Sequence, residues 1–92
     1  MELRHLRYFI AVAEEATMVA AAKRLRIAQP ALTRQIHDLE KELGADLFDR
    51  VPRGVVLTPA GEACLESARH ILHQVDVAFQ QAHASSHGRV GR

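Results

Sequence analysis

Hydrophobic residues recur every three or four positions in the first part of the chain. Between Leu3 and Ala16, apolar residues at positions 3, 6, 9, 10, 13 and 16 follow the spacing of an amphipathic helix. Thr17 follows, and its hydroxyl can accept a backbone N–H in the first turn of a second helix, from Met18 to about Leu25. Three consecutive alanines in that helix allow another helix to approach closely. The pattern predicts two closely crossing helices.

A third helix is predicted to start at Gln29-Pro30, because proline suits the first helical turn, where its missing N–H would be unsatisfied anyway. Its apolar positions are spaced four, three and four residues apart: Leu32, Ile36, Leu39 and Leu43. Gly44 stands where a left-handed helix cap is expected. The opposite face carries the polar residues Thr33 and Arg34. This face is therefore available for contact with another molecule.

The hydrophobic period changes after this helix. Short extended runs at 47–48 and 55–57 flank a turn that contains Pro52 and Gly54, which predicts a small β-hairpin. Thr58-Pro59 then repeats the cap-plus-proline start of a helix. The chain is thus expected to pass from helices into a hairpin and back into a helix.

The last predicted helix runs from Pro59 to about Ala84, roughly 26 residues and roughly 39 Å. Its apolar face is larger than the preceding residues can cover along the full length of the helix. A second copy of the chain, packed through the same helix, is the simplest cover. A helix packed on its own domain with a frayed end is the alternative. The residues predicted to form the dimer interface are Leu65, Ala68, Ile71, Leu72, Val75 and Phe79.

These elements predict a mainly α fold. Residues 1–58 are expected to form a winged helix-turn-helix, with three helices and a two-stranded β wing, and residues 59–84 a long linker and dimerisation helix. Residues 85–92 have no hydrophobic period and are expected to form a flexible tail or hinge. In a winged helix-turn-helix the third helix enters the major groove of DNA. The order of elements therefore indicates DNA binding.

The distribution of charge is more informative than its sum. The 92 residues carry a net charge of +1, which is no signature of a nucleic-acid binder. No acidic residue lies between Glu15 and Asp38. The basic residues in this interval are Lys23, Arg24, Arg26 and Arg34. Arg50 and Arg53 form a second basic group at the predicted wing. Solvated helix faces, or a wing arginine paired with Asp49, are the alternative interpretations of these charges.

Composition argues against several other classes of protein. No uncharged run approaches the ~20 residues of a membrane span, and the charged start lacks the features of a signal peptide, so we expect a cytoplasmic protein. The single cysteine, Cys64, cannot form an internal disulfide. His70 and His73 have the spacing of metal ligands but lack a complete ligand set, so no metal and no cofactor are expected. No combination of nucleophile, base and pocket predicts an enzyme.

Short motifs in a fixed order carry a family resemblance over about residues 2–80. They are Leu6-Arg7-Tyr8-Phe9, Ala21-Ala22-Lys23-Arg24-Leu25, Gln29-Pro30-Ala31-Leu32-Thr33-Arg34-Gln35-Ile36, Leu39-Glu40, Leu43-Gly44, Leu47-Phe48-Asp49-Arg50 and Leu57-Thr58-Pro59-Ala60-Gly61. Together they resemble the N-terminal domain of LysR-type transcriptional regulators. The opening of the chain and the region of Met18 are also similar to members that control operons for aromatic-compound degradation.

The resemblance implies a homodimer joined through the fourth helix that binds an interrupted palindrome in duplex DNA at a promoter. It also implies a transcription regulator that associates with the bacterial nucleoid, an activator, with a repressor as the alternative. Members of the family have a larger C-terminal effector-binding domain, which this chain lacks. A small-molecule inducer would therefore act only through that domain, and a tetramer would form only in a full-length protein. We interpret the chain as the DNA-binding portion of a longer regulator, with a free-standing domain as the alternative.

Residues near the start of the third helix are the candidates for base contact: Gln29, Pro30, Thr33 and Arg34. Arg34 can donate two hydrogen bonds to guanine or bind a phosphate, and Thr33 offers a hydroxyl and a methyl group for thymine. Gln29 can bind adenine or a phosphate, and Pro30 offers an apolar contact. Gln35, at the margin of this face, is a candidate for contact with the DNA backbone.

Further candidates lie outside the third helix. Arg50 and Arg53 could reach phosphates or a narrow minor groove, while Met18 could touch the sugar-phosphate chain or fill the core. Ala28 precedes the third helix, where family members often have serine, and cannot accept its amide bonds. Gln29 or a DNA phosphate are alternative acceptors there. A winged helix that binds other proteins is the competing function, against which the basic face without a large apolar patch argues.

Overall fold

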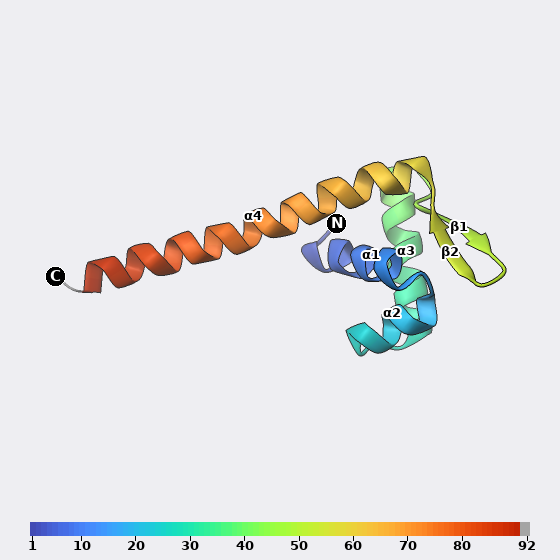
Figure 1. Cartoon of the computed structure of the whole chain (residues 1–92), viewed down its shortest axis with the longest axis horizontal. Coiled ribbons are helices and arrows are strands. Elements are labelled where there is room, and N and C mark those ends of the chain that lie inside the picture. Colours follow the sequence, from blue (N-terminus) through green and yellow to red (C-terminus); the bar gives the residue numbers. More distant parts are fainter. Residues whose placement is uncertain (91–92) are drawn as a thin grey trace.

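The computed structural model describes residues 1–90 and the side chains of residues 1–86. The elements in chain order are α1 (Leu3–Glu15), α2 (Met18–Leu25), α3 (Gln29–Leu43), β1 (Phe48–Val51), β2 (Gly54–Leu57) and α4 (Pro59–Val90). The first three helices and the hairpin pack together at one end, and α4 extends away from them (Figure 1). The predicted mainly α, winged helix-turn-helix fold is confirmed.

The helix boundaries follow from local hydrogen bonds that the sequence indicates. The Thr17 hydroxyl accepts the Ala20 amide at 3.0 Å, as predicted for the cap of α2. Gly44 closes α3 in the left-handed conformation, with φ +70°. Ala16 and Arg26 adopt the same left-handed conformation after α1 and α2, although neither is a glycine. These tight ends turn the chain directly from each helix into the next element.

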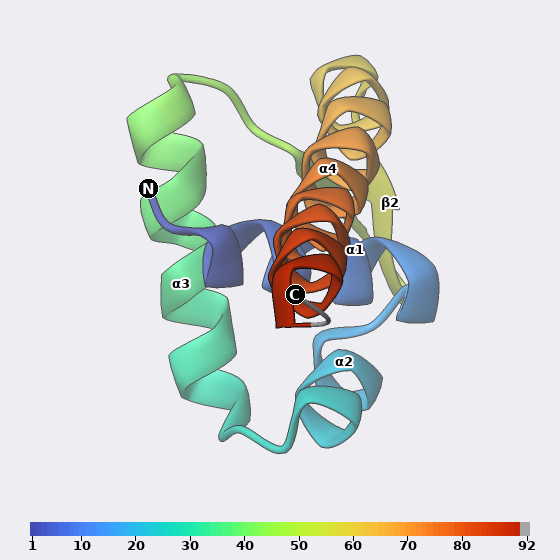
Figure 2. The ribbon, with the colours of Figure 1, turned by 90° about the vertical axis from the view of Figure 1, so that its left-hand side faces the viewer.

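The core lies where α1 crosses the other helices. Phe9 and Val12 of α1 are fully buried, and Leu32 and Ile36 of α3 meet them from the predicted apolar stripe. The Phe9 ring also lies against Phe48 of β1, with 5.3 Å between ring centroids. In Figure 2, α4 crosses in front of α1, and the start of α1 lies beside α3; α1 contacts both helices. Helix α1 is therefore the element through which α3 and α4 are held in place.

The wing is anchored to the helices at both of its ends. Its strands pair antiparallel, with Phe48 opposite Leu57 and Val51 opposite Gly54. Near the turn, the Val55 amide donates to the Ala16 carbonyl at 2.9 Å. At the base, the Glu40 carboxylate of α3 accepts the Leu47 amide at 2.7 Å. These two attachments join the wing to the end of α1 and to α3.

Helix α4 begins against the base of the wing. The Thr58 hydroxyl accepts the Gly61 amide at 3.0 Å, which confirms the predicted cap, and the Thr58 amide donates to the Leu47 carbonyl at 3.0 Å. Gly61 lies so close to this carbonyl that an added Cβ would be 2.1 Å from its oxygen. Beyond this attachment α4 packs mainly on α1. The first turn of α4 is thus fixed in place.

The helix is longer than predicted. It continues through Ser85 and Ser86 to Val90, so residues 85–90 are helical where a tail without regular structure was expected, and residues 91–92 lie outside the described part of the chain. Serine interrupts the hydrophobic period, but it costs an exposed helix only about 0.5 kcal/mol relative to alanine. Extending an existing helix also requires no new nucleation. Within residues 1–90, no helix combines the length and apolarity needed to cross a membrane.

Candidate nucleic-acid interface

The first turn of α3 has backbone donors without acceptors. Ala28 precedes the helix and makes no capping bond through its side chain, as the sequence predicts. Pro30 has no N–H, and the amides of Gln29 and Ala31 find no acceptor within the described residues. The Gln29 side chain accepts neither of these amides, and its amide nitrogen donates a long 3.5 Å hydrogen bond to the Thr33 hydroxyl. This helix terminus therefore favours an anion.

The predicted base-contacting residues share one exposed face of α3. Gln29, Pro30 and Arg34 are exposed, and Thr33 is half-buried beside them. Arg34 forms no ion pair within the described residues, so its guanidinium is available to an external acceptor. Gln35 is half-buried nearer the edge of this face. The arrangement places hydrogen-bond donors beside the apolar ring of Pro30, and this combination can contact the base edges in a groove of DNA.

Met18 lies at the boundary between this surface and the core. Its side chain is half-buried and packs on the core, which supports the core-filling alternative for the side chain. It also lines a cavity of about 40 Å³ together with Ile36, Phe48 and Arg50. Its backbone amide starts α2 and has no acceptor within the described residues, so it can still donate to a phosphate.

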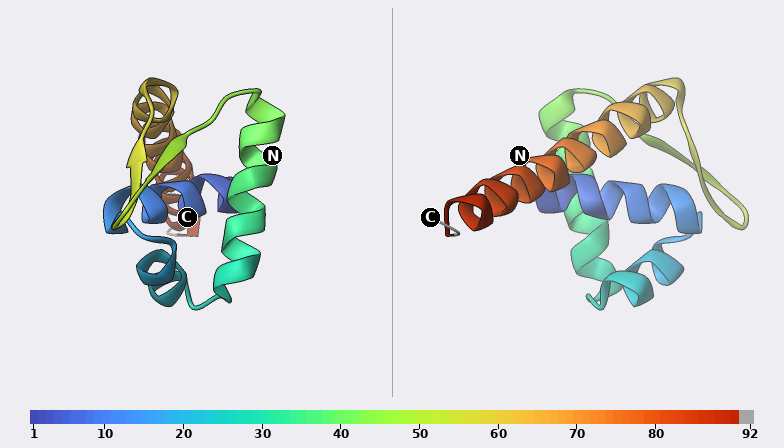
Figure 3. Two further views of the ribbon diagram at one scale, coloured as in Figure 1. Left: turned by 90° about the vertical axis from the view of Figure 1, so that its right-hand side faces the viewer. Right: turned by 60° about the vertical axis from the view of Figure 1, so that its left-hand side comes forward.

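The wing carries the second group of free cations. Arg50 lies on β1 opposite Val55, and Arg53 lies in the turn; both are exposed. Neither arginine forms an ion pair among the residues that the structure describes, so a bond between a wing arginine and Asp49 is not present there. The wing and the first turn of α3 lie apart on the surface (Figure 3). A ligand that contacts both must therefore be extended and negatively charged.

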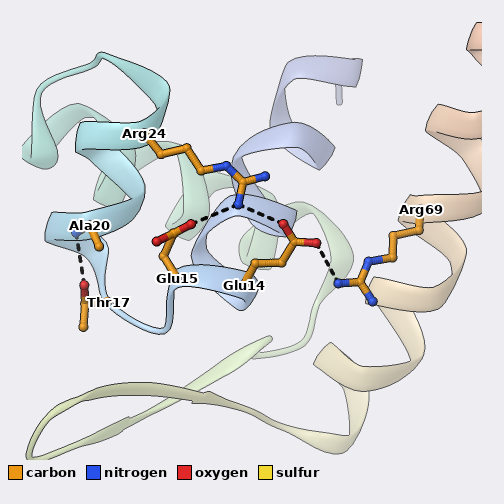
Figure 4. Close-up of polar contacts among 6 residues, drawn as sticks. All are labelled: Glu14, Glu15, Thr17, Ala20, Arg24 and Arg69. Carbon is orange, nitrogen blue, oxygen red and sulfur yellow. Dashed lines mark hydrogen bonds and ion pairs between the residues drawn. The ribbon is translucent and has the colours of Figure 1, made fainter.

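Arg24 belongs to a different arrangement, which the sequence did not reveal. Its guanidinium contacts Glu14 at 2.8 Å and Glu15 at 3.2 Å, and Arg69 of α4 contacts Glu14 at 2.8 Å (Figure 4). Hydrogen bonds from Arg69 and Arg24 hold the pKa of Glu14 below its usual value. The same carboxylates raise the pKa of Arg24. Arg24 is therefore engaged within the fold, and no local sequence signal connects Arg69 with Glu14.

The predicted dimer face of α4 divides into two parts. Ala68 is only 1% exposed and belongs to the core of its own chain, so its assignment to a dimer contact is wrong; α1 covers it. Leu65 and Leu72 are half-buried against the same core. Farther along, Phe79 is 72% exposed, and Ile71 is exposed as well. Val75 is half-buried. Only the distal part of the face is free to contact a second chain.

The thiol of Cys64 and metal binding are the other candidate sources of chemistry. Cys64 is half-buried against the core, and burial raises the pKa of its thiol, which disfavours the reactive thiolate. Among residues 1–86 no group of three or more histidine, cysteine or acidic side chains is placed to hold a metal ion.

Comparison with known proteins identifies this arrangement. The family described as "Bacterial regulatory helix-turn-helix protein, lysR family" matches residues 3–62. The chain belongs to the LysR family. The matched residues form α1, α2, α3, the wing and the start of α4. The relatives that match this chain are HTH-type transcriptional regulators.

Curated LysR-type relatives match the whole chain. The HTH-type transcriptional regulator ClcR of Pseudomonas putida is 54% identical over 91 residues, covering 99% of this chain and 31% of ClcR. The regulator TfdS of Cupriavidus pinatubonensis is 53% identical over 92 residues, covering 100% of this chain and 31% of TfdS. The chain thus spans about a third of the length of these relatives.

Solved structures confirm the LysR-type architecture. A crystal structure of the CbnR DNA-binding domain in complex with DNA matches with a TM-score of 0.90 and 50% identity, covering 94% of this chain and 99% of that one. A complex of the BenM DNA-binding domain with benA site 1 DNA also has a TM-score of 0.90, at 46% identity, covering 94% of this chain and 97% of that one. The chain is thus a LysR-type helix-turn-helix DNA-binding domain that continues into the long helix α4.

Proposed function

We propose that this chain binds duplex DNA sequence-specifically, with α3 in the major groove and the wing against the backbone. The observation that carries the proposal is the exposed start of α3, where amides without acceptors lie beside the free guanidinium of Arg34. Such a terminus gains an acceptor when a phosphate approaches it, while the neighbouring side chains reach the base edges. The DNA complexes of CbnR and BenM support this role for the same fold.

Each residue on α3 has a separate part in this proposal. Arg34 donates to guanine O6 and N7, and Thr33 contacts thymine through its methyl group or a base edge through its hydroxyl. Gln29 reaches adenine or a phosphate once its weak 3.5 Å contact with Thr33 is replaced. Pro30 supplies an apolar contact. Gln35, which is less exposed, contacts the DNA backbone.

The remaining contacts fix the position of the domain on the duplex. Arg50 and Arg53 bind phosphates or the adjacent minor groove, because both are exposed and neither is paired within the described residues. Met18 contributes through its backbone amide, since its side chain is occupied with the core. These contacts raise affinity for any sequence, whereas α3 supplies discrimination.

We further propose that two chains bind together on an interrupted palindrome. Residues 1–58 form the unit that contacts DNA, and α4 joins two such units. The exposed Ile71 and Phe79 form the centre of the contact between chains, with the half-buried Leu65, Leu72 and Val75 completing it where they remain accessible. Exposed apolar surface of this kind is stabilised by burial against a partner. The two-fold symmetry of the dimer would then match that of the site.

The relatives ClcR and TfdS are about three times longer than this chain, and in a protein of that length these contacts would serve transcriptional regulation. We propose an activator of an operon for aromatic-compound breakdown, acting on the nucleoid in the cytoplasm, because the opening residues and the Met18 region resemble regulators of such operons. A small-molecule inducer and a tetrameric assembly would depend on a C-terminal domain beyond this chain.

Selection from a pool of random duplexes at physiological salt tests the proposal, with the mass of the bound complex measured in parallel. Enrichment of a two-fold motif bound by two chains is the expected result. If one chain binds a single half-site, the result supports sequence-specific DNA binding and contradicts the dimer. No enrichment over random DNA would overturn the proposal and favour a module that binds other proteins.

A further inference from the structure

Glu14 connects three helices through a single carboxylate. It lies in the last turn of α1, accepts Arg24 of α2 at 2.8 Å through one oxygen and accepts Arg69 of α4 at 2.8 Å through the other. Arg24 makes a further contact of 3.2 Å with Glu15 (Figure 4). No other ion pair in the described residues joins α4 to the rest of the fold. The Glu14 carboxylate therefore links α4 to both α1 and α2 through charged side chains.

This link lies where the direction of α4 is determined. The helix is attached at its first turn, where Gly61 contacts the Leu47 carbonyl, and Arg69 follows eight residues, or about 12 Å, later. Val90 lies 29 residues, or about 44 Å, beyond Gly61. A sideways shift of α4 at Arg69 is thus multiplied between three and four times at its far end, by the ratio of these lengths.

Apolar packing alone does not fix this direction. Ala68 is the fully buried residue of α4 at the contact with α1, and Leu65 and Leu72 flank it while remaining half-buried. Burial of apolar surface is non-directional, so a small alanine side chain allows α4 to slide across α1. Charge-assisted hydrogen bonds from an arginine fork are directional. The contact between Arg69 and Glu14 therefore restricts the motion that the apolar contact permits.

We propose that Glu14 is a positioning residue that sets the direction in which α4 leaves the DNA-contacting unit, and thereby the distance between half-sites that a dimer accepts. The proposal rests on the proposed dimer through α4. In such a dimer both units are carried by their α4 helices, so a change of direction alters the separation and relative rotation of the two α3 helices. Glu14 touches neither base nor phosphate in this role.

The first experiment compares duplexes in which two selected half-sites are separated by the preferred spacing or by one base pair more or fewer. Glu14→Gln removes the carboxylate and keeps the size of the side chain. We expect it to reduce the preference for the best spacing about two- to fivefold, the range for an exposed ion pair, while affinity for a single half-site stays unchanged. Arg69→Gln should have the same effect.

The matched control is Glu15→Gln. Glu15 is 37% exposed in its side chain against 36% for Glu14, and it contacts Arg24 without touching α4. The spacing preference of this variant should equal that of the unsubstituted chain. An unchanged preference in Glu14→Gln, or equal losses in both variants, would overturn the proposal. Loss of dimeric DNA binding by the unsubstituted chain would instead overturn the proposed function.

A second measurement tests the positioning role without DNA. Spin labels at Lys23 and Gln81, both exposed, are introduced into a Cys64→Ser background, and doubly labelled chains are diluted into unlabelled protein. The distance distribution between α2 and α4 should broaden or shift in Glu14→Gln and in Arg69→Gln, but not in Glu15→Gln. Circular dichroism checks that each variant is folded. Identical distributions in all folded variants would refute the role of Glu14.

Discussion

The amide nitrogen of Val55 in β2 donates a 2.9 Å hydrogen bond to the carbonyl oxygen of Ala16, the residue that ends α1. Ala16 adopts the left-handed conformation, with φ +65°, and this turns its carbonyl toward the wing. The neighbouring Gly54 lies so close that an added Cβ would be 2.2 Å from the same oxygen. The position of the wing therefore depends on the backbone at the end of α1.

Gly54→Ala should destabilise the domain and displace the wing. The new methyl group would overlap the Ala16 carbonyl, and φ at Gly54 is +146°, a conformation that alanine rarely adopts. We expect a loss of about 2 kcal/mol or more in the free energy of unfolding, measured by chemical denaturation. Gly44→Ala is the control, since its φ is also positive but its Cβ meets no atom within 4 Å. An equal loss in both variants would show that the close approach is unimportant.

Arg34→Ala should lose discrimination at one base pair in each half-site. A bidentate contact between arginine and guanine accounts for about 1 to 3 kcal/mol of preference over the wrong base, and Arg34 has no other ion-pair partner within the described residues. Binding titrations on the selected site and on single-base variants measure this preference. Lys41→Ala, at the opposite end of α3, is the control. Equal weakening on specific and random DNA would exclude a base contact.

Arg53→Ala should weaken binding to all duplexes by a similar factor. Arg53 lies exposed in the wing turn, where binding to a phosphate contributes affinity without sequence preference. The slope of the logarithm of affinity against the logarithm of salt concentration should become shallower by about 0.9 for each phosphate that Arg53 neutralises. Titrations at several salt concentrations give this slope. An unchanged slope would mean that Arg53 touches no phosphate.

Phe79→Asp should separate the two chains without disturbing either fold. Phe79 is 72% exposed and lies beyond the part of α4 that packs on α1, unlike Leu72, whose replacement would also damage the core. A charge buried in the interface would dissociate the dimer, and affinity for a two-half-site duplex should fall about a hundredfold while half-site affinity persists. Sedimentation measures the oligomeric state, with Gln80→Asp as control. A mutant that stays dimeric would place the interface elsewhere.

The stability supplied by Glu14 should depend on pH. Arg69 and Arg24 lower the pKa of Glu14 in the folded chain, so the stabilisation is present above the unfolded pKa and is lost as the pH falls through the lower, folded pKa. Glu14→Gln should therefore be less stable than the unsubstituted chain at neutral pH, by at most about 1 kcal/mol because the pair is exposed. The difference should vanish in strong acid. Denaturation at a series of pH values tests this, and a difference that persisted in acid would contradict it.

Local patterns predicted the elements well because their causes are local. Thr17 and Thr58 cap the helices that follow them, and Gly44 ends α3, since each position is governed by hydrogen bonds within a few residues. The end of α4 was misplaced because Ser85 interrupts the hydrophobic period without breaking the helical backbone. Periodicity therefore predicted where a face is apolar, but not how far the helix extends.

Only the parts of the site whose residues lie close together in the sequence could be predicted from it. The face with Arg34 follows from its spacing relative to Leu32 and Ile36 on one helix. Ala68 was assigned to the dimer interface because periodicity cannot distinguish an apolar residue covered by α1 from one covered by another chain. The ion pair between Glu14 and Arg69 joins residues 55 positions apart, and only the folded arrangement of α1 and α4 brings them together.

The start of α3 has a consequence for how such domains diverge. Arg34 contributes no ion pair to the described fold, and Gln29 contacts only its neighbour Thr33 through its side-chain amide. Substitutions at these exposed positions should therefore leave folding almost unchanged. Natural selection can then alter the operator that a descendant recognises without first having to compensate for reduced stability. A duplicated gene could acquire a new set of target promoters through a few changes on one helix face, while inheriting the rest of the domain intact.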